Sequence, residues 1–250
     1  AKVKPVFLSM LKQKNFASYQ KVKTLREVKR LRLRDEVVYA EPNYIRRALQ
    51  VPNDTYYNLQ WHYPAINLPQ AWDLTTGNSG VIVAVVDTGV FLAHGDLTGQ
   101  LVSGYDFISD IENARDGDGI DSNPDDPGDS AQISSSSWHG THVAGTIAAT
   151  TNNSVGVAGV AWDAKIMPIR VLGAFGGSSY DIIQSIRYAA GLSNDSNTVP
   201  AQKADIINLS LGGGGFSQAS QDAYDAVRAE GIIVVAAAGN ENTSQLSYPA

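Results

Sequence analysis

The sequence predicts an α/β fold built on a doubly wound parallel sheet. Two observations lead to this prediction: apolar runs of strand length alternate with segments of helical periodicity, and polar or glycine-rich turns follow the apolar runs. Strands that are apolar throughout are typical of parallel sheets covered by helices on both faces. With 250 residues, 43% of them hydrophobic, the chain is long enough to bury such a core. Functional groups then collect at the carboxyl ends of the strands.

The predicted elements follow one another from residue 81 onward. The run 81–86 is apolar at every position and predicts a strand buried on both faces. Small residues fill the predicted helix 139–150, and Ile182, Ile183 and Ile186 share one face of a second helix. Gly231 ends a third helix. In full, the predicted strands are 81–86, 164–172, 204–211 and 232–238, and the predicted helices are 139–150, 180–190 and 217–230.

The first 50 residues differ in composition from the rest and predict a separate segment. Short apolar runs at 6–8 and 37–39 flank a helix-like stretch at 25–31, as in a small α+β unit. Pro42 and the Pro-Asn-Asp sequence at 52–54 mark a linker around residues 46–56. We therefore divide the chain into residues 1–50 and residues 51–250.

Charge separates the same two parts. Residues 1–50 hold 13 Lys or Arg and 4 Asp or Glu, whereas residues 51–250 hold 6 and 21. A basic arm can bind nucleic acid, but here core-type residues interrupt the bases and an acidic partner lies in the same chain. We expect the first segment to dock on the second, with a solvated basic face as the alternative. We expect no nucleic-acid partner.

Membrane insertion and cysteine chemistry are also disfavoured. No apolar run reaches the roughly 18 residues that a membrane-spanning helix requires. The chain has no cysteine, which excludes disulfides and thiolate zinc sites but does not fix the compartment. The chain does not begin with Met or with a signal-like segment, so we expect it to begin downstream of any targeting segment.

An acid and a base stand at two predicted element ends. Asp87 follows the strand 81–86 in a Val-Val-Asp-Thr-Gly sequence, where a carboxylate can orient an imidazole or simply cap a turn. His139 opens a helix in His-Gly-Thr-His-Val-Ala-Gly-Thr, as a base or as a helix-terminal histidine with a local hydrogen bond. His142 lies one turn on; because the zinc-protease spacing with its glutamate is absent, we interpret it as structural.

Two further strand ends carry polar or open backbone. Asn240 follows the run Ala-Ala-Ala-Gly and offers a side-chain amide that can stabilise an oxyanion, or serve as a turn residue. Ser210, Leu211 and Gly212 end the strand 204–211 with glycines that leave its edge open to an extended peptide. A plain glycine-rich turn explains residues 212–215 equally well.

The four motifs together resemble one family. Asp-Thr-Gly, His-Gly-Thr-His-Val-Ala-Gly-Thr, Ser-Leu-Gly-Gly and Ala-Ala-Gly-Asn occur here in the order found in the subtilisin-like serine proteases, or subtilases. The resemblance runs from about Asp54 to Ala250. It implies a subtilisin-like sheet, incomplete in this chain, and a secreted serine endopeptidase that acts on protein or peptide substrates without an organic cofactor.

The resemblance also implies residue roles. Asp87 becomes the orienting acid, His139 the general base and acid, Asn240 the oxyanion donor, and Ser210-Leu211-Gly212 the strand that pairs with substrate. Residues 1–50 resemble the C-terminal part of an inhibitory, folding-assisting propeptide, because residues 38–44 (Val-Tyr-Ala-Glu-Pro-Asn-Tyr) are similar to how those pro-domains finish.

The nucleophile of the family is missing from these residues. It lies in a Gly-Thr-Ser-x-Ala motif, and neither this motif nor a Gly-x-Ser-x-Gly elbow occurs between Ala1 and Ala250. We expect a zymogen fragment that is inactive alone. The alternative is a non-catalytic peptide-binding or scaffold protein of the same fold. A dinucleotide-binding protein is disfavoured because Asp-Thr-Gly replaces the Gly-x-Gly-x-x-Gly turn.

Two segments are candidate calcium sites. The sequence Thr-Asn-Asn-Ser-Val-Gly-Val at 151–157 resembles the calcium loop of the family. The resemblance implies a Ca²⁺ ligand set of Asp54, Asp96, Asn153 and the carbonyls of Val155 and Val157. A polar surface turn is the alternative.

The second candidate is the insertion 110–129, which holds eight acids and one base, Arg115. Counted from Asp116 as an EF-hand loop, its last position is Pro127 instead of the bidentate Glu, so it is not an EF-hand. A mobile acidic loop and an irregular calcium site both remain open.

Overall fold

The computed structural model of the chain describes residues 16–43, 50–130 and 135–250. The chain divides into two compact units, Ala1–Ala48 and Leu49–Ala250. The described part of the first unit contains one helix, α2 (Phe16–Leu31), followed by turns and loop. Among the described residues of both units, no helix is both long enough and apolar enough to cross a membrane.

The small α+β unit expected in the first segment is corrected in one respect. The helix is present and longer than the predicted stretch 25–31, but residues 37–39 form no strand. Val38 and Tyr39 are 97% and 78% exposed, because no neighbouring strand among the described residues pairs with them. The apolar run 6–8 lies outside the described residues.

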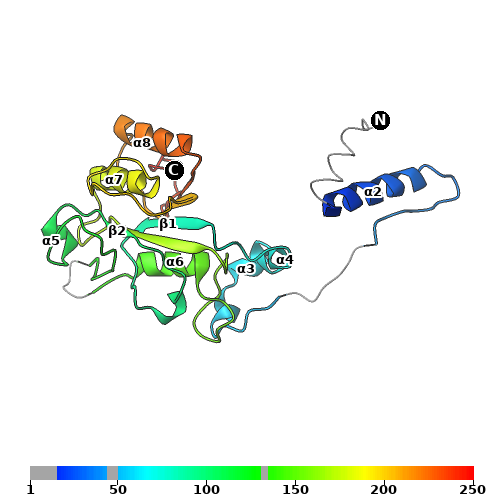
Figure 1. Cartoon of the computed structure of the whole chain (residues 1–250), viewed down its shortest axis with the longest axis horizontal. Helices are drawn as coiled ribbons and strands as arrows, with labels where there is room; N and C mark the ends of the chain where they lie inside the picture. Colours follow the sequence, from blue (N-terminus) through cyan, green and yellow to red (C-terminus); the bar gives the residue numbers. More distant parts are fainter. Residues whose placement is uncertain (1–15, 44–49, 131–134) are drawn as a thin grey trace. The chain divides into compact units, whose positions relative to one another are not determined.

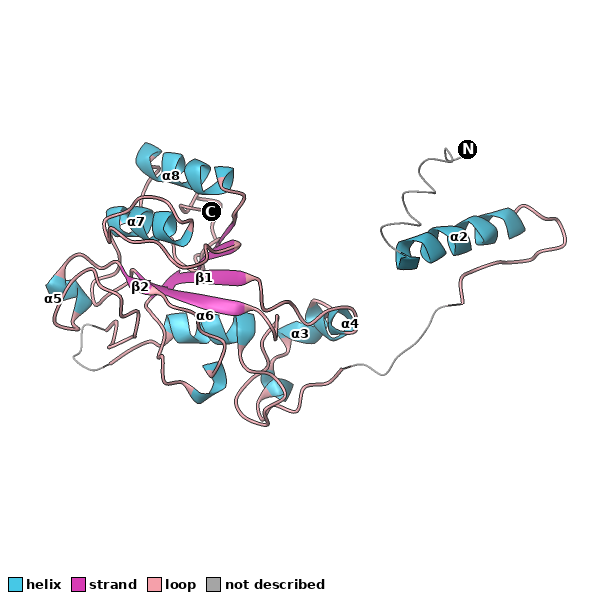
Figure 2. Cartoon of the chain, viewed as in Figure 1, coloured by secondary structure: helices cyan, strands magenta, loops and turns pink. Residues whose placement is uncertain are grey.

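The second unit is built on a parallel sheet of five strands in the order β2-β3-β1-β4-β5 (Figures 1 and 2). The strands are β1 (Ile82–Asp87), β2 (Tyr105–Asp106), β3 (Lys165–Arg170), β4 (Ile206–Leu209) and β5 (Ile233–Ala236). β1 lies in the middle and is buried at every position. The predicted α/β class and four of these strands are thereby confirmed; β2, only two residues long, was not predicted.

Helices cover both faces of the sheet. α6 (His139–Ala148) packs on one face, where Ala144 and Ala148 contact Val83 and Val85 of β1. α7 (Ser179–Ala189) and α8 (Gln218–Ala229) cover the other face, and Figures 1 and 2 show them on the side opposite α6. The doubly wound arrangement therefore follows from β1 itself, whose alternate side chains enter two cores.

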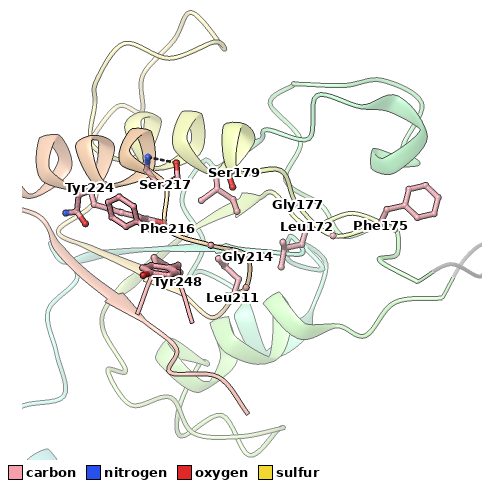
Figure 3. A pocket seen from close by; sticks show the side chains of 18 residues that line it. Leu172, Phe175, Gly177, Ser179, Leu211, Gly214, Phe216, Ser217, Tyr224 and Tyr248 are labelled. Carbon is pink, nitrogen blue, oxygen red and sulfur yellow. Dashed lines mark hydrogen bonds between the residues drawn. The ribbon is translucent and has the colours of Figure 1, made fainter. Parts of the chain in front are cut away.

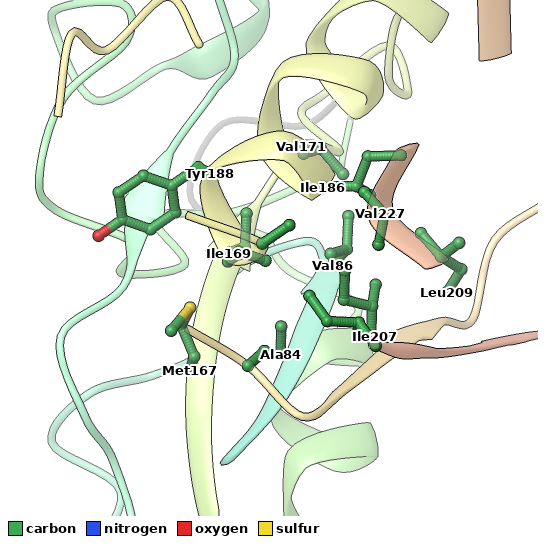
Figure 4. Close-up of a cluster of buried hydrophobic side chains, with 14 of the residues drawn as sticks. Ala84, Val86, Met167, Ile169, Val171, Ile186, Tyr188, Ile207, Leu209 and Val227 are labelled. Carbon is green, nitrogen blue, oxygen red and sulfur yellow. The ribbon is translucent and has the colours of Figure 1, made fainter. Parts of the chain in front are cut away.

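The larger core lies under α7 and α8 (Figure 4). Ala84 and Val86 of β1 meet Ile207 of β4, and Ile186 and Val227 close the cluster from the two helices. All five are at most 1% exposed. The remaining helical segments of this unit are short: η1 (Tyr57–Leu59), α3 (His62–Ala65), α4 (Leu68–Trp72), η2 (Gly95–Leu97) and α5 (Ile111–Ala114).

β5 is the outermost strand on its side of the sheet. It pairs with β4 from Ile206–Ile233 to Leu209–Ala236, and no other described strand pairs with its outer edge. Val234 and Ala236 pack against the larger core, whereas Ile233 and Val235 are 60% and 48% exposed. β5 thus presents apolar side chains to solvent on the face that α6 covers elsewhere.

Candidate active site

An aspartate and a histidine meet at the carboxyl end of β1. Asp87 is the last residue of β1 and is fully buried, and its Oδ1 lies 2.7 Å from Nδ1 of His139. The backbone N–H of Thr88 donates to the same oxygen at 2.8 Å. The carboxylate holds the proton of the imidazole on Nδ1, so Nε2 keeps a lone pair that can accept a proton.

Burial sets the electrostatics of this pair. Removal from water raises the pKa of the Asp87 carboxyl, and hydrogen bonds from His139 and Thr88 oppose that rise. The nearby Asp126 carboxylate raises it further by repulsion. The imidazole of His139 is 47% exposed, whereas Asp87 is inaccessible. One partner is thus open to reactants and the other is shielded from water.

Gly140 allows α6 to start so close to β1. A Cβ atom at this position would overlap the carbonyl oxygen of Gly89 and lie 3.1 Å from Cβ of Asp87. Real Cβ atoms essentially never make the first of these contacts, so only glycine permits this packing. The geometry therefore requires both residues of the His-Gly pair. His139 contacts the acid, and Gly140 has no side chain that would hold α6 away from the end of β1.

The predicted oxyanion and substrate residues lie at the neighbouring strand ends. In the sheet register Val86 pairs with Leu209, which pairs in turn with Ala236. Because all three strands are parallel, the segments that follow them emerge at the same edge. Ser210, Leu211 and Gly212 line a cavity of about 370 Å³ together with Gly239 and Asn240. The backbone N–H of Asn240 donates to the carboxylate of Glu241, and its side chain is exposed.

A second cavity, of about 540 Å³, adjoins this one through Leu211 and Gly212 (Figure 3). Figure 3 shows Leu172, two residues after β3, near Leu211, two residues after β4. Phe175, Phe216, Tyr224 and Tyr248 add aromatic surface. The wall formed by residues 172–177 was missed in the sequence. Gly173, Gly176 and Gly177 directly after a predicted strand were the signal that could have revealed it.

Comparison with known proteins agrees with this geometry. Residues 78–250 match the model of the subtilase family of peptidases. The chain belongs to the subtilase family. It is 47% identical over 215 residues to an extracellular protease of Xanthomonas campestris pv. campestris and 45% identical over 224 residues to an extracellular basic protease of Dichelobacter nodosus. These matches cover 80% and 83% of the chain, which spans 37% of the length of each relative.

A solved structure extends the likeness of this subtilase to three dimensions. A protease from Pseudoalteromonas arctica superimposes with a TM-score of 0.75 at 47% sequence identity. The match covers 80% of this subtilase and 62% of that chain. The predicted family and fold are therefore confirmed.

The candidate calcium loop of the subtilase is closed by hydrogen bonds. Asp96 is 3% exposed, and its two carboxylate oxygens accept from Nδ2 of Asn153 and from the N–H of Val157, both at 2.8 Å. The N–H of Val155 donates to Oδ1 of Asn153 at 2.8 Å. Asp54 joins the same loop by accepting from the N–H of Asn152 at 3.0 Å. Structure and sequence thus place all five predicted ligand residues around one loop.

Two observations on this loop fit a cation. Oδ1 of Asp54 is buried and has no hydrogen-bond partner among the described residues. A Cβ atom at Gly156, which has φ +52°, would overlap the Asp96 carboxylate. Two buried carboxylates beside loop carbonyls are the oxygen ligands that Ca²⁺ takes, and a buried oxygen without a partner is costly.

The acidic insertion gathers a different cluster. Carboxylate oxygens of Asp116, Asp118 and Asp121 lie within 4.8 Å of one another. Asp116, however, also accepts from Arg170 at 2.6 Å. The guanidinium of Arg170 is fully buried and pairs with Asp106 as well, so part of the insertion's charge is neutralised by the sheet.

Proposed function

We propose that this subtilase is the zymogen portion of a secreted serine endopeptidase that acts through an Asp-His-Ser triad. The observation that supports this most directly is the 2.7 Å contact between Asp87 and His139 at the sheet edge that also carries residues 210–212. The names of the two extracellular relatives support secretion. Within residues 16–43, 50–130 and 135–250 the ring of His139 bonds to Asp87 and to no serine hydroxyl.

The proposed reaction uses the pair as base and then as acid. Nε2 of His139 takes the proton from a serine Oγ supplied by the rest of the protein, and that oxygen attacks the carbonyl carbon of the scissile peptide bond. The side chain of Asn240 donates to the oxyanion. His139 then protonates the leaving amine. Water hydrolyses the acyl-enzyme by the same proton transfers in reverse order.

The substrate is a protein or peptide in extended conformation. Residues 210–212 leave β4 with their backbone beside the two cavities, and a peptide backbone can pair there as an added strand. The adjoining aromatic side chains of Phe216, Tyr224 and Tyr248 take no part in the proposed chemistry and serve to hold substrate side chains.

Residues 1–50 are proposed as the C-terminal part of an inhibitory propeptide. The segment is basic, the rest of the chain is acidic, and Leu25 and Leu33 are 49% and 80% exposed. Opposite charge and exposed apolar side chains are what a docking inhibitor offers. A synthetic peptide of residues 1–50 is expected to inhibit the processed peptidase, and an absence of inhibition at micromolar concentration would contradict this role.

Calcium is proposed at Asp54, Asp96, Asn153 and the carbonyls of Val155 and Val157. When bound, the ion supplies positive charge that ties the chain near Asp54 to the loop after α6. We propose a structural role for the ion, because the loop comes after Ala148, at the opposite end of α6 from His139.

The test of the proposed function is fluorophosphonate labelling, which reports an activated serine. The longest protein that the gene encodes is expected to take up the label and to lose it in His139→Ala, whereas the chain Ala1–Ala250 alone takes up none. Labelling of Ala1–Ala250 would show that the nucleophile lies within it. A gene product without a label or peptidase activity would favour the non-catalytic, peptide-binding alternative.

A further inference from the structure

Asp126 is a buried carboxylate beside the catalytic pair that the proposed reaction does not use. It comes from the acidic insertion and is 3% exposed. Its Oδ1 accepts from the N–H of Gly128 at 2.9 Å. Its Oδ2 accepts from the hydroxyls of Ser136 at 2.7 Å and Thr88 at 3.3 Å. A buried charge with several donors is an organised element of a structure, since burial without them is costly.

Thr88 connects Asp126 to the start of α6. Its hydroxyl has one proton, which it donates to Asp126, so its oxygen is left to accept. The N–H of Gly140 donates to that oxygen at 3.0 Å. The first N–H groups of a helix have no partner within the helix, and Trp138, the N-cap residue of α6, makes no side-chain capping bond. Thr88 therefore caps α6 from outside.

The segment that carries Asp126 is itself fixed to the turn after β1. The carbonyl of Pro124 accepts from the N–H of Val90 at 3.1 Å, and Asp125 accepts from the N–H of Leu92 at 2.9 Å. Residues 124–126 thus lie along residues 88–92. This attachment gives Asp126 a defined position relative to Asp87, which immediately precedes Thr88.

We propose that Asp126 is a positioning residue of the catalytic pair, which acts through the hydroxyl of Thr88 to hold the first turn of α6, and with it His139, against Asp87. The inference rests on the proposed function for its catalytic consequence. Among the neighbouring charged groups, Asp129 raises the pKa of Asp126 by repulsion, Asp126 in turn raises that of Asp87, and His139 faces Asp87.

Charge supports the same relation. The Asp126 carboxylate raises the pKa of Asp87 by repulsion, and burial raises the pKa of Asp126 itself. Neutralising Asp126 therefore lowers the pKa of Asp87. A carboxylate with only a packing role, remote from the pair, has no such effect.

The kinetic test compares Asp126→Ala, Thr88→Val and the double variant in the longest protein that the gene encodes. Each single variant is expected to lower kcat about tenfold with KM changed less than twofold, because a displaced base slows the chemical step. The double variant is expected to be no slower than Thr88→Val, since both act through one hydrogen bond. Thr88→Ser, which keeps the hydroxyl that Thr88→Val removes, should have a kcat close to that of the wild type.

The matched control is Asp125→Asn, which removes the charge of an adjacent carboxylate but keeps the Oδ1 that accepts from the N–H of Leu92, so the attachment of residues 124–126 is retained. It is expected to leave kcat within about twofold of the wild type, since it does not reach the pair. Multiplicative losses in the double variant, or a change in KM at constant kcat, would overturn the proposal.

A second measurement does not depend on catalysis. In the chain Ala1–Ala250, ¹³C NMR titration of Asp126→Asn is expected to show the pKa of Asp87 lowered relative to the wild type, because the repulsion from the Asp126 carboxylate is removed. In Asp126→Ala the amide of Gly140 should also exchange faster with solvent. If neither the pKa of Asp87 nor the exchange rate of the Gly140 amide changes, the inference is overturned even if the peptidase is active. If the wild type hydrolyses no peptide, the proposed function fails while this arm still decides the role of Asp126.

Discussion

Replacing Asp87 by asparagine separates the chemical role of this residue from its structural one. Oδ1 accepts two hydrogen bonds, at 2.7 Å from His139 and 2.8 Å from Thr88, and Oδ2 is buried without a hydrogen-bond partner among the described residues. A hydrogen bond to a carboxylate contributes roughly 1 kcal/mol more than one to a neutral amide, so the two bonds weaken by about 2 kcal/mol. Burial raises the pKa of Asp87, which means that a neutral group recovers desolvation energy.

The two effects offset each other in stability but not in catalysis. We expect the free energy of unfolding to change by about 1 kcal/mol or less, because weaker bonds and relieved desolvation have opposite signs. If the amide NH₂ faces Nδ1, the imidazole must carry its proton on Nε2 and cannot act as a base. For this reason kcat should fall by roughly 10³–10⁴-fold.

The assay is peptide hydrolysis by the longest gene product, with thermal unfolding measured in parallel. Asp205→Asn is the control: this carboxylate accepts from the N–H of Ile82 at 2.9 Å, at the other end of β1. This variant should leave kcat within about twofold of the wild type, since Asp205 lies at the amino ends of β1 and β4, and Asp87 and His139 meet at the carboxyl end of β1. Activity of Asp87→Asn within tenfold of wild type would refute the assignment of this residue as the orienting acid.

Three other outcomes are expected. Chelation should lower the melting temperature of the wild type and of Asp118→Ala but not of Asp96→Ala; an unchanged wild type would remove both calcium sites. Gly140→Ala should lower the free energy of unfolding, because the added Cβ overlaps the Gly89 carbonyl. In NMR the proton on Nδ1 of His139, which bonds to Asp87, should exchange faster with solvent. Burial raises the pKa of Tyr63 to about 12. Stability from this phenol is thus complete below pH 10 and lost as pH rises through about 12, by about 3 kcal/mol, and Tyr63→Phe should remove that loss in a pH series of unfolding measurements.

Periodicity predicted the sheet well because its strands are apolar at nearly every position. The run 81–86 corresponds to β1, shifted by one residue, and the helix predicted over 139–150 ends two residues early, at Ala148. The strand predicted over 204–211 is shorter in the structure, since pairing with β1 ends at Leu209. Ser210 and Leu211 thereby leave the ladder and reach the cavities.

The parts that the sequence did not reveal depend on contacts between distant segments. Asp126 is one of eight acids in the insertion, and nothing in its local sequence distinguishes it from Asp125. Only the fold brings it 3.3 Å from the hydroxyl of Thr88. β2 was not predicted for another reason: a strand of two residues is too short to show a hydrophobic periodicity. The resemblance to subtilases supplied the roles of Asn240 and of the calcium loop, which residue chemistry alone left open.

The outer edge of β5 has a practical consequence for handling this chain. No strand in the described part of the chain pairs with this edge, and its backbone groups and the exposed side chains of Ile233 and Val235 form a template on which a second chain can add a strand. Molecules of Ala1–Ala250 should therefore self-associate as their concentration rises, and light scattering should detect it. Ile233→Lys places a charge on this edge and should keep the chain monomeric without altering the contact between Asp87 and His139.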